Sequence, residues 1–230
     1  MSQPLAGQDS PDGEGNTDTI VAEWIRLNEV PERLTHQNRA ELGILYRDLQ
    51  APEPARQEAA VRRIERLYRE RRELSPELTD LLVFAVVGPF TTQRVGAAPA
   101  LPGPVARISA LELLGDVGGV RARRGVLEAL RHERDTAVLS AAVVSLGSMR
   151  PPPSTEITGL LTGLLEGRSA RREPQLVRAI LETTRILGQP PYAISDPDLY
   201  RAILAIAQGP YPRSLREHAY ELVDELREPR

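Results

Sequence analysis

Apolar residues recur along this chain at the spacing of an α-helix, and the stretch from 135 to 147 shows the pattern most clearly. Asp135 can accept hydrogen bonds from the free backbone N–H groups at a helix start. Apolar residues then follow at i, i+3, i+4 and i+7 from Leu139 to Leu146, directly before Gly147. The stretch therefore predicts a short helix with one buried face, an N-cap at Asp135 and an end at Gly147.

The same pattern returns at intervals of 32 to 42 residues. Its further copies are Ala110, Leu111, Leu114 and Gly115; Ile180, Thr184, Leu187 and Gly188; and Ala219, Leu222, Val223 and Leu226. Partner helices between these copies are indicated by the pairs Leu127 and Leu130, Leu161 and Leu164, and Ile203 and Ile206. Two helices per unit at this repeat length predict a helical solenoid.

The sharpest copy resembles the HEAT repeat, whose signature is an Asp at the inter-helix turn, then Val-Arg, a small residue and a closing Leu-Gly. The matching residues are Asp135, Val138, Ala142, Leu146 and Gly147, with Leu139 in place of the usual Arg. Similar cores are Leu215, Arg216, Ala219 and Leu222, and more weakly Ala55, Arg56 and Ala59. The resemblance covers roughly residues 35–227 and implies an all-α, right-handed α-solenoid of about five HEAT-like hairpins.

Composition and helix-breaking residues divide the chain into a tail and one domain. Residues 1–17 are rich in Gly, Pro, Ser and Asp, and we expect a disordered N-terminal tail. Residues 18–230 are expected to form one HEAT-like repeat domain, in which a helix begins at Asp18 and the last one begins with a capping box of Ser214 and Glu217. The longest break, residues 88–103, is either a functional or a disordered loop. Phe90 and Arg94 would be its contact-making residues.

Composition excludes several kinds of chemistry. The chain has no cysteine, and all 29 of its basic residues are arginine. Disulfides, thiolate nucleophiles and a Schiff-base or P-loop lysine are therefore excluded. The lack of lysine reflects either a GC-rich genome or selection against lysine modification. The apolar runs are too short to cross a bilayer, and no secretory signal is recognisable, so we expect a cytoplasmic protein without membrane insertion.

The histidines give no indication of a metal site. His36, His132 and His218 lie in different repeats, and none has a second histidine at i+3 or i+4. The HEAT-type deoxyhypusine hydroxylases need several His-Glu dipeptides, and only His132 with Glu133 matches. We expect no metal, no cofactor and no enzymatic activity.

An arginine stripe on the helix predicted to begin at Pro54 is the clearest charge pattern. Arg62, Arg66 and Arg69 stack at i, i+4 and i+7, and glutamates at 58 and 65 stand four residues before two of them. Three readings remain open: a solvated face with internal ion pairs, a docking surface for an acidic protein, and a nucleic-acid contact.

The repeat resemblance implies that the second helix of each hairpin lines a concave binding surface. These helices would include residues 105–114, 136–146, 175–187 and 214–226. Their exposed candidates for partner binding are Glu112, Arg178, Glu182, Arg185, Arg216 and Glu221. Mixed charge favours a protein or peptide partner, so we predict a non-enzymatic scaffold or assembly-factor module, with its oligomeric state open. The alternative is a nucleic-acid-binding protein, similar to the HEAT-like DNA glycosylases, that uses the arginine stripe.

Overall fold

The computed structural model describes residues 36–92, 102–167 and 173–227, and every regular element in these ranges is an α-helix. The helices are α2 (His36–Leu49), α3 (Pro54–Arg71), α4 (Pro76–Thr92), α5 (Pro104–Val117), α6 (Gly119–His132), α7 (Thr136–Met149), α8 (Thr155–Glu166), α10 (Pro174–Leu187), α11 (Pro197–Gln208) and α12 (Arg213–Arg227). The all-α prediction is confirmed for these residues.

The chain divides into two compact units, residues 1–43 and 44–230. Of the first unit, the structure describes residues 36–43, which form the start of α2. The tail predicted for residues 1–17 and the helix predicted from Asp18 lie outside the described residues. All that follows concerns the second unit.

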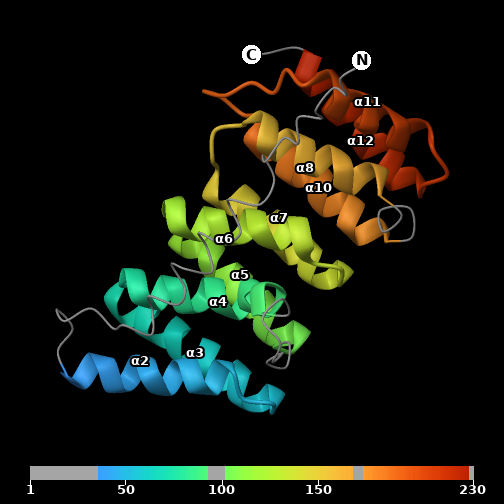
Figure 1. Cartoon of the computed structure of the whole chain (residues 1–230). Helices are drawn as coiled ribbons and strands as arrows, with labels where there is room; N and C mark the ends of the chain where they lie inside the picture. The colour runs from blue at the N-terminus through green and yellow to red at the C-terminus, as the bar shows by residue number, and fades with distance from the viewer. Residues whose placement is uncertain (1–35, 93–101, 168–172, 228–230) are drawn as a thin grey trace, which may run out of the picture. The chain divides into compact units, whose positions relative to one another are not determined.

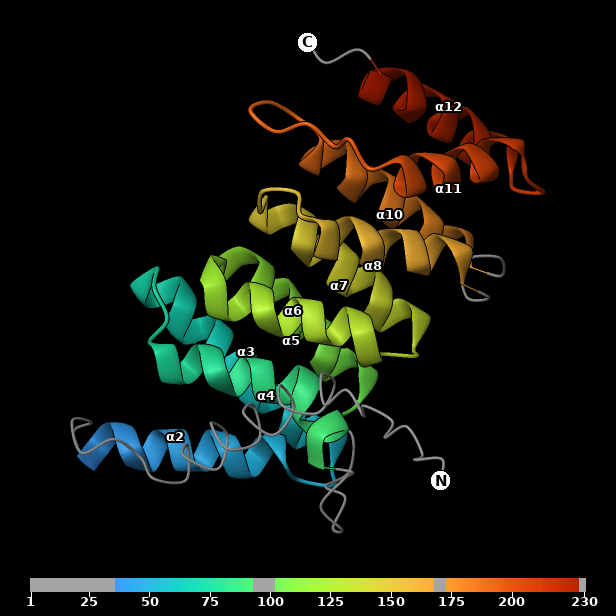
Figure 2. The same ribbon diagram turned by 45° about the horizontal axis from the view of Figure 1, so that its top comes forward.

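The helices of the second unit form two rows. In the first row α3 packs against α5, α5 against α7, α7 against α10 and α10 against α12. In the second row α4, α6, α8 and α11 follow one another in the same way. Figures 1 and 2 show these helices succeeding one another in chain order from α3 to α12. Each extensive contact joins helices that are neighbours, or next but one, in the described sequence.

The repeated apolar positions form the core between the rows. Leu111 and Leu114 on α5, Leu146 on α7, and Ile180 on α10 are fully buried. These are the residues that the helical spacing assigns to the inner face of each copy. The predicted buried faces are therefore confirmed.

Two repeat glycines, predicted to end helices, lie inside them. Gly115 is buried within α5 and Gly147 within α7. A Cβ at Gly115 would come within 3.1 Å of Ser145 Cα, and one at Gly147 within 3.0 Å of Thr183 Oγ1. The prediction was wrong because the missing side chain serves a close approach of the next helix in the first row rather than a turn.

A hydroxyl completes each of these close approaches. Ser145 Oγ on α7 donates to the Leu111 carbonyl of α5 at 2.7 Å. Thr183 Oγ1 on α10 donates to the Val143 carbonyl of α7 at 3.0 Å. In both cases the accepting carbonyl belongs to the residue four positions before the glycine. Glycine and hydroxyl together bring the backbones of successive first-row helices into direct contact.

The N-cap predicted at Asp135 is confirmed, because its side chain accepts hydrogen bonds from the first backbone N–H groups of α7. Ser154 and Asp196 cap α8 and α11 in the same way. The capping box at Ser214 was wrong, because α12 already begins at Arg213 and Glu217 pairs with that arginine at 2.6 Å.

The predicted break after α4 begins later than expected, and the connection between α5 and α6 is very short. The helix α4 continues to Thr92, so the predicted 88–103 break begins later and Phe90 lies in a helix; Arg94 lies outside the described residues. Gly88 lies within α4 beside the Phe84 ring, where a Cβ would come within 2.5 Å of a ring carbon. The connection between α5 and α6 is the single residue Gly118, whose φ of +65° favours glycine.

A buried ion pair supports the turn between α6 and α7. Arg107 Nη1 on α5 donates to Glu133 Oε2, and these side chains are 7% and 4% exposed. The other Glu133 oxygen accepts from the backbone N–H groups of Arg134 and Asp135 at 2.7 and 2.8 Å. Arg107 Nε has no hydrogen-bond partner among the described residues. One carboxylate thus joins α5 to the turn that starts α7.

We expect Gly115→Ala to lower the free energy of unfolding by roughly 1–3 kcal/mol, because the new methyl group meets the backbone of α7. Gly159→Ala on α8 is the matched control, since nothing lies within 4 Å of its added Cβ. It should raise stability by about 0.5–1 kcal/mol through helix propensity. Urea unfolding followed by circular dichroism measures both, and equal stability of the two variants would contradict the close-approach role.

We expect Arg107→Met to cost about 3–5 kcal/mol, because it leaves the Glu133 carboxylate buried without its cation. Arg213→Met removes a pair whose side chains are 85% and 55% exposed, and it should cost less than about 1 kcal/mol. The same unfolding measurement compares them. A similar small loss in both variants would show that the buried pair does not hold the turn.

Candidate functional site

The helix α7 presents an uncharged surface to solvent. No residue from Thr136 to Met149 is charged. Ala137, Val144 and Ser148 are exposed and Ala141 is half-buried, at positions spaced three or four residues apart. Val144 is 52% exposed, although its neighbours Val143 and Ser145 are buried against the rest of the second unit. We call these four exposed and half-buried residues the α7 strip.

Charged side chains lie on the two first-row helices that flank α7. Glu112 is exposed on α5, and Arg178 and Glu182 are exposed on α10. The predicted candidates Arg216 and Glu221 are exposed on α12. The prediction of an exposed Arg185 was wrong, because only 27% of its side chain is accessible and carboxylates surround the rest.

The surroundings of Arg185 bring together three of the predicted residues. Arg185 Nε donates to Glu225 Oε2 at 3.0 Å, and its other nitrogens lie 3.7 Å from Glu221 and 3.9 Å from Glu182. His218 Nε2 lies 3.5 Å from the same Glu182. Helices α10 and α12 contribute all of these groups. We call Glu182, Arg185, Glu221 and Glu225 the α10–α12 charge cluster, and carboxylates outnumber the guanidinium group in it.

The arginine stripe on α3 is partly neutralised within its own helix. Arg62 pairs with Glu58 at 3.3 Å, and Arg69 pairs with Glu65. Arg66 is exposed between them. The ion pairs of the first of the three readings are therefore present, and their exposure means that each adds little stability.

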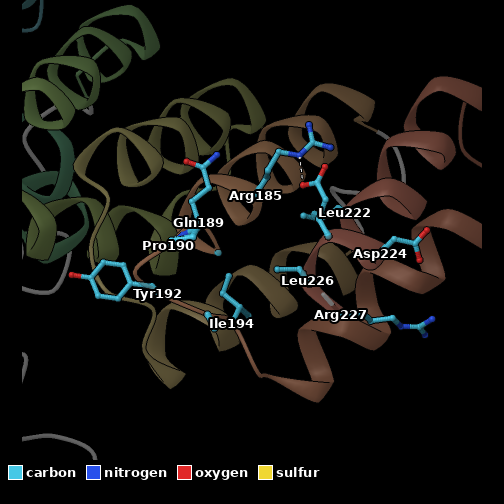
Figure 3. Close-up of a pocket in the computed structure, with 12 residues that line it drawn as sticks. Arg185, Gln189, Pro190, Tyr192, Ile194, Leu222, Asp224, Leu226 and Arg227 are labelled. Atoms are coloured by element: carbon cyan, nitrogen blue, oxygen red, sulfur yellow. Dashed lines mark hydrogen bonds and ion pairs between the residues drawn. The ribbon is translucent and has the colours of Figure 1, made fainter. Parts of the chain in front are cut away.

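Next to the charge cluster lies a groove of about 890 Å³ that the sequence did not predict. The groove is lined by the end of α10, the end of α12 and the segment 188–194, which leads from α10 towards α11. Figure 3 shows Ile194, Leu222 and Leu226 converging at its centre, with Tyr192 at one end and Asp224 and Arg227 at the other. The sequence signal was a tyrosine in a Gln-Pro-Pro-Tyr segment, which alone indicates only a turn.

Hydrogen bonding shifts the pKa of two surface groups. The Thr158 hydroxyl donates to the Asp196 carboxylate and, with the backbone N–H groups of Leu199 and Asp198, lowers the pKa of Asp196 despite its partial burial. The hydrogen bond and charge of Glu217 raise the pKa of Arg213. Asp196 thereby links α8 to the start of α11 through its ionised form.

Further observations bear on chemistry and relationship. In the described ranges no three or more His, Cys, Asp or Glu side chains are arranged to hold a metal ion. None of the helices there is long and apolar enough to cross a membrane. No family model, curated protein or solved structure matches the chain. The surface chemistry of the first row is therefore the observation that bears most directly on function.

We expect Thr158→Val to lower stability by roughly 1–2 kcal/mol near neutral pH, because it removes the hydrogen bond to the charged Asp196. A lowered folded-state pKa stabilises the fold fully above the ordinary value of 3.8, and this contribution is lost as the pH falls through the folded-state value. The difference between wild type and variant should therefore shrink on acidification. Urea unfolding from pH 7 down to pH 3 measures it, and a pH-independent difference would contradict the assignment.

Proposed function

We propose that the second unit is a HEAT-like, right-handed α-solenoid that acts as a non-enzymatic protein-interaction module. Among the described helices, the extensive contacts join helices one or two places apart in the chain, and this supports the proposal because a repeat array has the same property. The Asp at the α6–α7 turn and the Leu-Gly pair of Leu146 and Gly147 support the resemblance from the sequence. The partner is a protein or peptide that lies on the first row.

The α7 strip is the observation that carries the proposal. Its alanine, valine and serine side chains can be covered by a partner without the cost of removing a charge from water. Such a surface suits the apolar side chains of a protein, whereas a phosphate backbone would find no cation on α7. The strip also lies in the middle of the first row, where a partner can contact α5 and α10 at the same time.

The flanking charges would set the orientation of the partner. Glu112 lies on one side of α7, and Arg178 and Glu182 lie on the other. Opposite charges around an uncharged centre are typical of protein interfaces, whose polar rim contributes to specificity more than to affinity.

Nucleic-acid binding through Arg62, Arg66 and Arg69 is the competing hypothesis. The glutamates that pair with Arg62 and Arg69 reduce the positive potential that phosphates require. Phosphate contacts would also make affinity fall steeply between about 50 and 200 mM salt.

We expect Val144→Arg to weaken capture of the partner by roughly tenfold or more, because it places a charge at the centre of the interface. Val120→Arg on α6 is the matched control, since Val120 is also exposed, at 74%, but lies in the second row. The tagged protein would be purified from its own cells with and without nuclease, and the retained proteins quantified.

A partner that survives nuclease and is lost only with Val144→Arg would support the proposal. Equal loss with both variants, or release of everything by nuclease, would overturn it. If nuclease releases everything, Arg66→Glu should abolish binding to duplex DNA or RNA, and raising the salt concentration from about 50 to 200 mM should abolish it too.

A further inference from the structure

We propose that the groove beside α10 and α12 binds a segment of the partner in which a basic side chain stands next to an apolar one. This inference rests on the proposed function and specifies the chemistry of the partner at one place on the module. The groove of about 890 Å³ lies within the size range of pockets that hold small ligands or a few side chains.

The centre of the groove is apolar. Leu222 is fully buried, Ile194 is 9% exposed and Leu226 is half-buried, and the three side chains converge there (Figure 3). A leucine-sized side chain placed on them would be removed from water, and this is the favourable contribution expected from apolar contact. Tyr192, 41% exposed at one end, adds an aromatic surface beside this centre.

The charges around the groove select a cation. Asp224 lines the groove and has no hydrogen bond or ion pair within the described part of the chain. Glu225 lines it too and shares Arg185 with Glu182 and Glu221, which leaves the charge cluster negative. An acidic or phosphorylated segment would meet uncompensated carboxylates here. An arginine or lysine would meet charges of opposite sign.

The second arginine of the groove does not cancel this preference. The Arg227 guanidinium lies 5.1 Å from the centre of the Tyr200 ring on α11. In Figure 3 its side chain extends away from Ile194 and Tyr192, as does that of Asp224. The Arg227 charge is therefore directed towards an aromatic ring outside the apolar centre. Asp224, Arg227 and the charge cluster together carry four carboxylates and two guanidinium groups, so the surroundings of the groove are negative overall.

The test uses a fluorescent peptide, acetyl-Ser-Arg-Leu-Ser-Arg-Leu-Ser-amide, and the full chain. Two comparison peptides carry Glu in place of Arg, or Ser in place of Leu. Fluorescence anisotropy gives each dissociation constant for the wild type and for Asp224→Arg, Tyr192→Ala and Glu166→Arg. Glu166→Arg changes the charge by the same amount on α8, at an exposed position away from the groove.

We expect the Arg-Leu peptide to bind, and Asp224→Arg and Tyr192→Ala each to weaken binding roughly fivefold, as surface charge and aromatic contacts do. Glu166→Arg should leave binding unchanged, and both comparison peptides should bind more weakly. Equal binding of the Glu peptide, no binding of the Arg-Leu peptide, or insensitivity to both groove substitutions would overturn the inference. Self-association of the chain that Asp224→Arg abolishes would overturn it as well, by assigning the groove to a second copy.

Failure of the inference can be told apart from failure of the proposed function. Partner capture that depends on Val144 while the peptide does not bind would leave the protein-interaction module standing and remove the groove from it. Peptide binding that depends on Asp224, with capture insensitive to Val144→Arg, would keep the groove and remove the α7 strip. Both measurements use the same purified chain, and circular dichroism confirms that each variant is folded.

Discussion

The close approach of successive first-row helices is the constraint on which the second unit depends. At Gly115 and Gly147 the absence of a side chain lets backbone or hydroxyl atoms of the next helix lie within 3.1 and 3.0 Å of the position that a Cβ would take. Ser145 and Thr183 then donate hydrogen bonds to the carbonyls of the preceding helix. Both features fix the spacing between successive helices of the first row, and the extensive contacts among the described helices join helices one or two places apart in the chain.

A second constraint holds the two rows together at their connection. The Glu133 carboxylate accepts hydrogen bonds from Arg107 and from two backbone N–H groups of the turn before α7. Asp135 then caps α7 directly. This arrangement gives a physical account of the two acidic residues in the turn between α6 and α7: one carboxylate joins the turn to α5, and the next starts the helix.

The side chains of the first row change from uncharged on α7 to charged on α10 and α12, and this change supports the proposed function. The contacts of α7 to α5 and α10 use Ser145 and Gly147 of α7 and Thr183 of α10, and no residue of α7 is charged. The helices α10 and α12 face each other with charged side chains, and charged groups of both signs surround an apolar groove. An uncharged centre for burial and a charged end for orientation are the two requirements of a specific protein interface.

The sequence by itself determined the helices, their buried faces and the cap at Asp135, because these depend on the helical period and on hydrogen bonds within a few residues. The spacing of glutamates and arginines also indicated the ion pairs within α3. Only the tertiary structure decided that Gly147 is a contact rather than a helix end, and that Arg185 is surrounded by carboxylates of α12. Both outcomes depend on residues about 40 positions away, where spacing along the chain carries no information about distance in space.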